Sequence, residues 1–180
     1  MKSSRLQLIT ALTLIVFVVS LRLLPHPANF APVAAVALFG GAVLPRRLAL
    51  WVPLGAMVVS DLFIGFYSMM WMTWGCYLLV ALASSHWLRK PSLPRGVALT
   101  LLSSLFFFVV TNFAVWLTSG MYAHTWTGFA RCYEMALPFF RNTALSDLLY
   151  SGMLFGLYAL ANRMALRRPD SAIGTRSAAA

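Results

Sequence analysis

The chain has 180 residues, of which 61% are hydrophobic and only 10% are charged, with a net charge of +10 and a mean hydropathy of +0.79. A soluble domain usually carries about 25% charged residues, so the composition excludes an ordinary soluble domain and indicates one compact membrane domain. The positive charge does not indicate nucleic-acid binding, because the basic residues lie in short clusters between apolar runs.

Six apolar segments follow one another, at residues 6–24, 32–44, 48–66, 69–88, 97–119 and 143–164. A membrane-crossing helix needs about 20 apolar residues. The second segment is short for a hydrocarbon core of roughly 30 Å, so it either begins earlier, near Ala28, or does not cross fully. We predict an all-α membrane protein with six transmembrane helices.

The basic residues are divided unequally between the two sides that six crossings define. With the amino terminus inside, eleven of them fall inside: Lys2, Arg5, Arg46, Arg47, Arg89, Lys90, Arg95, Arg163, Arg167, Arg168 and Arg176. Only Arg22, Arg131 and Arg141 fall outside. Basic residues in short loops stay in the cytoplasm, so we expect both termini to be cytoplasmic.

We expect a single transmembrane domain at residues 1–166. The first segment reads as a retained helix and not as a cleaved signal peptide, because its apolar run reaches Leu24 and no small-x-small site precedes Pro25. Residues 120–142 are too polar to span and too aromatic for a loose linker, which predicts an outer lid or re-entrant helix. Residues 167–180 are polar and rich in small residues, so we expect a disordered cytoplasmic tail.

Small residues in the second segment predict a close contact between helices. Ala37 and Gly41 are four residues apart and therefore share a helix face. Small side chains on one face let two helix backbones approach within the membrane. We interpret this pair as ordinary helix packing and not as a special docking site.

Three acids lie in or near the predicted outer half of the membrane. Asp61 is late in the third segment, Asp147 is early in the sixth, and Glu134 is in the outer segment. Ionisable groups inside a membrane are costly and usually functional. Asp61 and Asp147 either form structural ion pairs, with the outer arginines as partners, or contact a ligand directly, and the two roles are compatible.

Cys76, in the fourth segment, has three interpretations from the residues alone. A membrane cysteine commonly serves as a small hydrophobe. In an oxidising compartment it can also pair with Cys132, and as a thiolate it can bind a soft metal. His26 and His124, both in outer loops, either bind a metal, pair with an acid or are solvated.

The outer aromatic residues admit two interpretations. These residues are Trp71, Trp74, Trp116, Tyr122, Trp126 and Tyr133. An interfacial belt is common in membrane proteins, whereas Trp126 and Tyr133 lie in a loop of mixed polarity, and such rings would suit the walls of an apolar ligand site. The chain has no GxSxG, HExxH or P-loop motif. We therefore predict no nucleotide site and no hydrolysis of ATP by this chain.

Several blocks of the sequence resemble a known group of membrane proteins. Six short helices, a mass near 20 kDa, an outer polar pocket and an aromatic outer loop resemble the substrate-binding S components of energy-coupling-factor (ECF) vitamin transporters. The blocks LPHPANFAPVAAVALFGGAVLPRR, SDLFIGFYSMMWMTWGCY, TNFAVWLTSGMY and CYEMALPFFRNTALSDLLYSGMLFG are similar to the BtuM-type cobalamin transporters of Gram-negative bacteria. The similarity covers most of residues 20–160.

This resemblance implies an S-component-like bundle in the bacterial inner membrane that binds cobalamin from the periplasmic side. It implies that Cys76 coordinates the corrin cobalt, and such ligation is associated with removal of the cyano group from cyanocobalamin. His26, Asp61 and Tyr77 lie in the same blocks and become pocket candidates. The first segment lacks the AxxxA docking pattern, since Ile15 follows Ala11, which argues against assembly with an ECF energising module and favours a solitary transporter.

On the strength of this resemblance, we predict a cobalamin uptake protein with Cys76 as cobalt ligand. Residues 120–142 would close over the corrin, and Arg131 or Arg141 would meet its amide-rich rim. A second hypothesis keeps the fold but assigns another vitamin or small molecule, recognised through Asp61, Asn112 and the aromatic residues. A third is a structural membrane protein without a small-molecule ligand, which the outer grouping of costly polar residues argues against.

Overall fold

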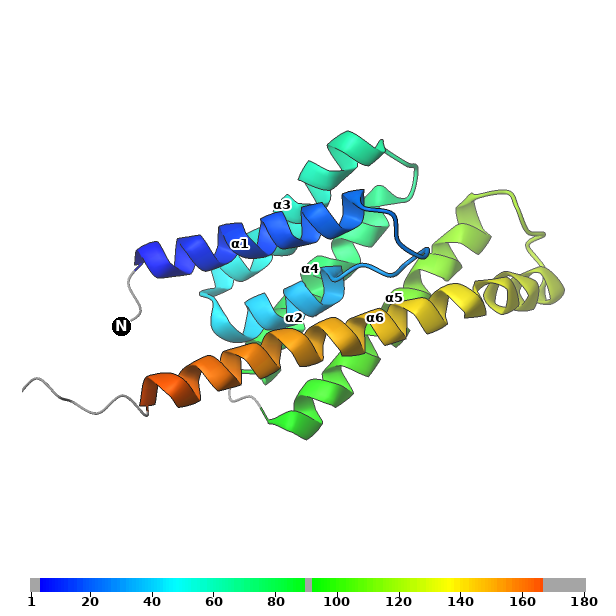
Figure 1. The fold of residues 1–180 in the computed structure, drawn as a ribbon. Helices are drawn as coiled ribbons and strands as arrows, with labels where there is room; N and C mark the ends of the chain where they lie inside the picture. Colours follow the sequence, from blue (N-terminus) through cyan, green and yellow to red (C-terminus); the bar gives the residue numbers. More distant parts are fainter. Residues whose placement is uncertain (1–3, 90–91, 167–180) are drawn as a thin grey trace, which may run out of the picture.

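Six helices make up the computed structural model, which describes residues 4–89 and 92–166 (Figure 1). Their bounds are α1 Ser4–Leu23, α2 Val33–Val43, α3 Arg46–Ile64, α4 Met70–Trp87, α5 Leu93–Thr118 and α6 Trp126–Leu166. The described ranges contain no strand, which agrees with the predicted all-α class. The predicted tail at 167–180 lies outside the described residues.

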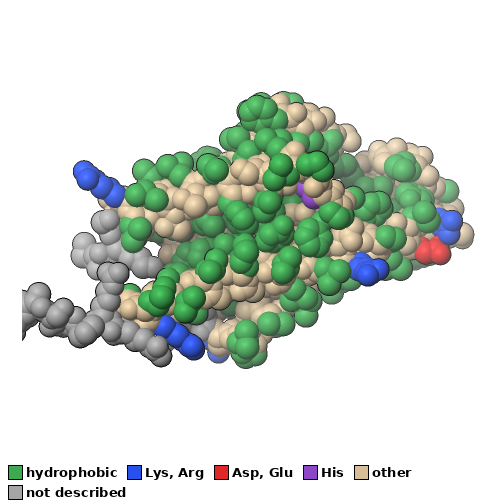
Figure 2. Space-filling view, viewed as in Figure 1, with side chains coloured by type: hydrophobic (Ala, Val, Ile, Leu, Met, Phe, Trp, Pro, Cys, Tyr) green, Lys and Arg blue, Asp and Glu red, His purple; other side chains and the backbone are tan. Residues whose placement is uncertain are grey.

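Four of these helices, α1, α3, α5 and α6, are long and apolar enough to cross a membrane. The space-filling view agrees: on the face shown, apolar side chains cover most of the middle and the charged groups gather toward the two ends (Figure 2). The helix α4 does not belong to this group, and its 18 residues include threonine, serine and histidine. The helix α2 has only 11 residues.

The short α2 is the centre of the bundle. It contacts all five other helices, and every residue from Val33 to Gly41 is buried. A helix that is apolar all round is stable only when other helices surround it. The shortness of the predicted second span is therefore the mark of a core helix, and the helix begins at Val33, not near Ala28.

The backbone of α2 at Gly41 packs directly against α4, as the small residues of α2 predict. Ala37 is fully buried. A Cβ atom added at Gly41 would lie 2.6 Å from the Ser84 Cβ and 2.7 Å from the Ala81 carbonyl oxygen. The Ser84 hydroxyl donates across this contact to the Leu38 carbonyl. The hydrogen bond forms because glycine allows the approach.

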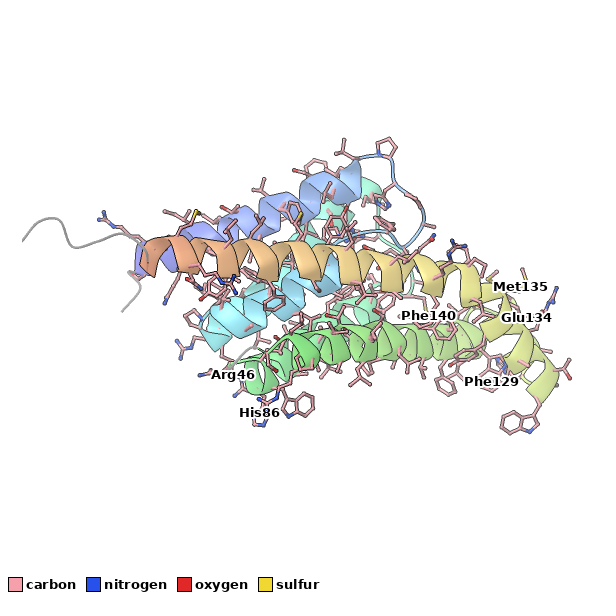
Figure 3. All side chains as sticks on the ribbon, turned by 60° about the horizontal axis from the view of Figure 1, so that its bottom comes forward. Arg46, His86, Phe129, Glu134, Met135 and Phe140 are labelled. Atoms are coloured by element: carbon pink, nitrogen blue, oxygen red, sulfur yellow. The ribbon has the colours of Figure 1, made fainter. Side chains whose placement is uncertain are left out.

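The bundle has two distinct ends (Figure 1). The start of α1 and the end of α6 lie at one end, called here the terminal end. The α1–α2, α3–α4 and α5–α6 loops lie at the other, called here the loop end. In Figure 3, Arg46 and His86 lie at the terminal end, and Glu134 lies at the loop end.

The last helix is longer than the sequence indicated. The sequence predicts a lid at 120–142 and a span at 143–164, whereas the structure has a loop at 119–125 and one helix from Trp126 to Leu166. At about 1.5 Å per residue these 41 residues reach about 60 Å, twice the hydrocarbon core. Pro138 lies inside the helix, and the helix axis bends in this amino-terminal part (Figure 1).

The extension is helical because it has its own apolar face. Its buried and half-buried residues recur at helical spacing: Phe129, Cys132, Tyr133, Ala136 and Phe140. Phe129 packs edge-on against Trp116 of α5 at 5.4 Å, and Phe140 packs against Phe108 at 4.7 Å (Figure 3). The Tyr133 hydroxyl donates to the Val109 carbonyl at 2.7 Å. The polar residues that suggested a lid lie on the other face.

The α2–α4 contact predicts a large difference between two identical substitutions. Gly41→Ala should destabilise the protein by about 1–3 kcal/mol, because the added methyl overpacks a rigid contact. Gly75→Ala, within α4, should be neutral or slightly stabilising, because nothing lies within 4 Å of the added Cβ. Thermal unfolding in detergent measures both, and equal midpoints would contradict the close packing.

Candidate functional site

All six helices contribute to one polar cavity near the loop end, with a volume of about 290 Å³. Its lining residues are Arg22, His26, Asn29, Ala31, Val33, Met57, Tyr67, Thr73, Tyr77, Phe107, Thr143 and Asp147. His26 and Asn29 come from the exposed α1–α2 loop, and Tyr67 comes from the α3–α4 loop. The cavity is thus bordered by loops on one side and by the centre of the bundle on the other.

Arg22, in the last turn of α1, is held by two other helices. Its guanidinium contacts Asp61 at 2.8 Å, and it donates to the Ser60 hydroxyl at 2.8 Å and to the Met57 sulfur at 2.7 Å. The other Asp61 carboxylate oxygen accepts from the Trp74 indole N–H at 2.8 Å. Asp61 is fully buried, and the Arg22 side chain is 13% exposed. This cluster ties α1, α3 and α4 together.

Arg22 still has donors to offer the cavity. A guanidinium has five N–H groups, and the three contacts to Met57, Ser60 and Asp61 use three of them. Asp61, by contrast, has both carboxylate oxygens occupied and lines neither this cavity nor its neighbour. Asp61 therefore positions Arg22, and Arg22 is the group that faces the cavity.

Asp147 has the opposite environment. It is 2% exposed, and one carboxylate oxygen accepts a hydrogen bond from Ser104 of α5 at 2.6 Å. Among the described residues no arginine, lysine or histidine forms an ion pair with it. Its second oxygen is left for the cavity that it lines. Asp147 is thus a buried acid without a cation.

Aromatic rings and a phenol form the remaining walls. Tyr77 of α4 stacks on Phe107 of α5, with ring centroids 5.1 Å apart and planes 20° apart. Both residues line the polar cavity. Burial raises the pKa of the Tyr67 phenol above its ordinary value, so Tyr67 is a neutral hydrogen-bonding group at physiological pH.

A second cavity of about 230 Å³ lies beside the first, between α4, α5 and α6. The two share Asn29, Thr73, Phe107 and Thr143 as lining residues. The second is more aromatic, and its further lining residues are Met69, Met72, Phe108, Thr111, Asn112, Val115, Phe139 and Phe140. Together they form a continuous polar and aromatic region that suits a small organic molecule.

Four of the residues predicted from the sequence come together here. His26, Tyr77 and Asp147 line the polar cavity, and Asn112 lines its neighbour. The His26 ring lies 2.9 Å from the Pro27 carbonyl. The Asn112 amide donates to the Phe108 carbonyl at 2.8 Å.

Five predicted residues lie away from both cavities: Tyr122, His124, Trp126, Arg131 and Arg141. His124 packs edge-on against Trp116 at 5.4 Å, and Trp126 is 86% exposed. Arg131 pairs with Glu134, one turn along the exposed face of α6, at 2.9 Å. The ion pairing expected of the outer arginines therefore holds for Arg22 with Asp61, and Asp147 has no such partner.

Cys76 is 1% exposed and lines neither cavity, although the next residue, Tyr77, lines the polar one. Cys132 is buried too, with its thiol 3.5 Å from the Asn112 carbonyl oxygen. Both cysteines are free thiols, so no disulfide joins them. Within residues 4–89 and 92–166, no group of three His, Cys, Asp or Glu side chains is arranged to hold a metal ion.

Some residues of the candidate site could not be identified from the sequence. Arg22 was considered only as an ion-pair partner, although a charge in the last turn of an apolar helix is itself a functional signal. Ser104 and Thr143 gave no signal, because serine and threonine are common in membrane helices. Phe107 lies in the run FFF, from which the sequence does not tell which ring faces inward.

Comparison with known proteins gives a family but no activity. A family model described as a family of unknown function, DUF6580, matches residues 2–170, so the chain belongs to this family. No curated protein and no solved structure matches the chain.

The two ion pairs predict a contrast in stability. Asp61→Asn should cost about 3–5 kcal/mol, because it leaves the Arg22 charge buried without its partner. Glu134→Gln should cost less than about 1 kcal/mol, because its pair with Arg131 has side chains 60% and 63% exposed. Denaturation in mixed detergent micelles measures both changes.

The double variant Arg22→Met with Asp61→Leu provides the control for this contrast. It removes both charges at once, so it should recover a large part of the stability lost in Asp61→Asn. Equal losses for Asp61→Asn and Glu134→Gln would contradict the burial of the Arg22 cluster.

Proposed function

We propose that this member of the DUF6580 family is a membrane uptake protein that captures a small organic molecule in the polar cavity. The observation that carries the proposal is the convergence of all six helices on one cavity holding Arg22 and Asp147. Burying ionisable groups in a membrane bundle is costly. A protein with a purely structural role gains nothing from aiming two of them at a shared cavity, whereas a binding protein needs them to orient its ligand.

The proposal includes a six-span topology with both termini in the cytoplasm. Six described basic residues support it by their place at the terminal end: Arg5, Arg46, Arg47, Arg89, Arg95 and Arg163. Arg22, Arg131 and Arg141 belong to the loop end. Basic residues in short loops stay in the cytoplasm, so the cavity would face the periplasm of a bacterial inner membrane. The lipid bilayer is then the protein's solvent. The helix α2, buried from Val33 to Gly41, would be shielded from lipid by the other helices, whereas α4 would present Trp71, Leu79 and Trp87 to it.

Cobalamin is the ligand that the sequence resemblance implies, with Cys76 as an axial ligand to cobalt. Thiolate is a soft donor that suits cobalt in a corrin. In the ligation step the Cys76 sulfur donates its electron pair to cobalt, cyanide leaves with its own pair, and the thiol proton passes to water. The cobalt keeps its oxidation state. Such an exchange is secondary to transport.

Cobalt ligation by Cys76 is not possible in the conformation that the structure shows. Cys76 is 1% exposed and lines neither cavity, and neither cavity is large enough to enclose a corrin. Cobalt ligation therefore requires a second state, in which α4 separates from its neighbours at the loop end. The same geometry favours, as a second candidate, a different ligand small enough to be enclosed by about 290 Å³.

The cobalamin proposal predicts a spectral change. Protein purified in detergent and mixed with cyanocobalamin should shift the visible corrin spectrum, and Cys76→Ala should abolish the shift. Cys132→Ala is the matched control, since it removes a second buried, free thiol and should leave the shift unchanged. Identical spectra for wild type and Cys76→Ala would contradict the sulfur–cobalt bond.

The topology predicts opposite reactivity for two exposed positions. Met121, in the α5–α6 loop, is 72% exposed, and Leu93, at the start of α5, is 82% exposed. In cells with a permeable outer membrane, a membrane-impermeant maleimide should label Met121→Cys, and it should label Leu93→Cys only after lysis. The native cysteines are 1% and 2% exposed, so the wild-type protein should not be labelled and serves as the negative control. The reverse pattern would contradict the orientation.

A further inference from the structure

Within the part of the chain that the structure describes, Asp147 is the one acid that lines the polar cavity. The polar residues that line the cavity with it are Arg22 from α1, His26 and Tyr67 from the loops, and Tyr77 from α4. The helix α2 brings Val33, α3 brings Met57, and α5 brings Ser104 and Phe107. Arg22 is the only permanent cation among these described residues.

That cation is already neutralised. Arg22 contacts the Asp61 carboxylate at 2.8 Å, and this carboxylate is fully buried. The pair carries no net charge, so a deprotonated Asp147 would add one uncompensated negative charge to a site 2% exposed. Such a charge is costly, and a buried acid without a cation takes up a proton instead.

The contacts of Ser104 fit a protonated Asp147. The Ser104 oxygen lies 2.6 Å from an Asp147 carboxylate oxygen and 3.1 Å from the Thr100 carbonyl oxygen. Since a hydroxyl has one proton to donate, both contacts become hydrogen bonds only when Asp147 donates to Ser104 and Ser104 donates to Thr100. When Asp147 is deprotonated, the hydroxyl turns and donates to the carboxylate. Ser104 can therefore satisfy Asp147 in either state.

We propose that Asp147 is a proton-binding site, which exchanges its proton with the loop end through the polar cavity and releases it when a positively charged N–H group of a ligand binds its second carboxylate oxygen. Proton binding is inferred from the contacts of Asp147 alone, whereas displacement of the proton by a ligand rests on the proposed function. The group that displaces the proton would be an ammonium or amidinium nitrogen, since only a positively charged N–H donor replaces the charge of the proton as well as its hydrogen bond. The acceptor atoms of the same ligand would meet the unused N–H groups of Arg22. Uptake would then be linked to proton movement.

The test uses the apolar reagent dicyclohexylcarbodiimide on the full-length protein in detergent. The reagent adds to a protonated carboxyl group in an apolar site and gives a stable N-acylurea that retains every atom of both partners. Peptide mass spectrometry should locate the adduct on Asp147, with a yield that falls as the pH rises. Asp147→Asn should lose this adduct. Glu134→Gln, which removes an exposed acid, should keep it.

Ser104→Ala keeps the test decisive if Asp147→Asn fails to fold. It removes the donor that stabilises the carboxylate, so labelling should persist to a pH about one unit higher, because a hydrogen bond to a charged group is the stronger one. Absence of an Asp147 adduct at every pH, or an unchanged profile in Ser104→Ala, would overturn the proton-binding site.

Adding cyanocobalamin before dicyclohexylcarbodiimide tests separately whether Asp147 binds a proton and whether cobalamin is the ligand. Slower labelling of Asp147 is the result expected if cobalamin occupies the cavity. Labelling that is pH-dependent but not slowed would overturn cobalamin as the ligand, and the proton-binding site would stand.

Discussion

The interaction on which the rest depends is the buried contact of Arg22 with Asp61. It joins the end of α1 to α3, and the Trp74 indole extends it to α4. In a bundle surrounded by lipid, no bulk water solvates a buried charge, so Arg22 and Asp61 must find their hydrogen-bonding and charged partners inside the protein. This requirement fixes the helices at the loop end, and it places the remaining Arg22 donors against the cavity instead of against lipid.

The cavity also depends on the packing of the central helix α2 against its neighbours. Six helices can converge on one small space only if the central helix is thin, and α2 is made almost entirely of alanine, glycine and valine with single Leu and Phe residues. Gly41 brings α4 close, and the Ser84 hydroxyl closes the contact on the Leu38 carbonyl. This contact holds α2 and α4 together near the terminal end, and the polar cavity and its neighbour lie at the loop end.

Much of the fold could be predicted from the sequence, because apolar length and turn residues determine where membrane helices begin and end. The close face of Ala37 and Gly41 could also be predicted from spacing. The start of α6 could not, because polar residues such as Arg131 and Glu134 hid the apolar face formed by Phe129 and its neighbours. The candidate site was predicted only in part, since which loop aromatic or arginine turns inward depends on the bend of α6 and not on local sequence.

Asp61 and Asp147 show most clearly why the site needed the structure. Both are aspartates in the loop half of apolar helices, and their sequence contexts, VVSDLF and ALSDLL, are nearly alike. One has a cation and an indole on its two oxygens, and the other has a single serine. An acid that is already neutralised cannot respond to an incoming molecule, whereas an acid left with a free oxygen must take either a proton or a ligand. The difference in partners, not in residue type, makes Asp61 part of the frame and leaves Asp147 with an oxygen for the proposed binding chemistry.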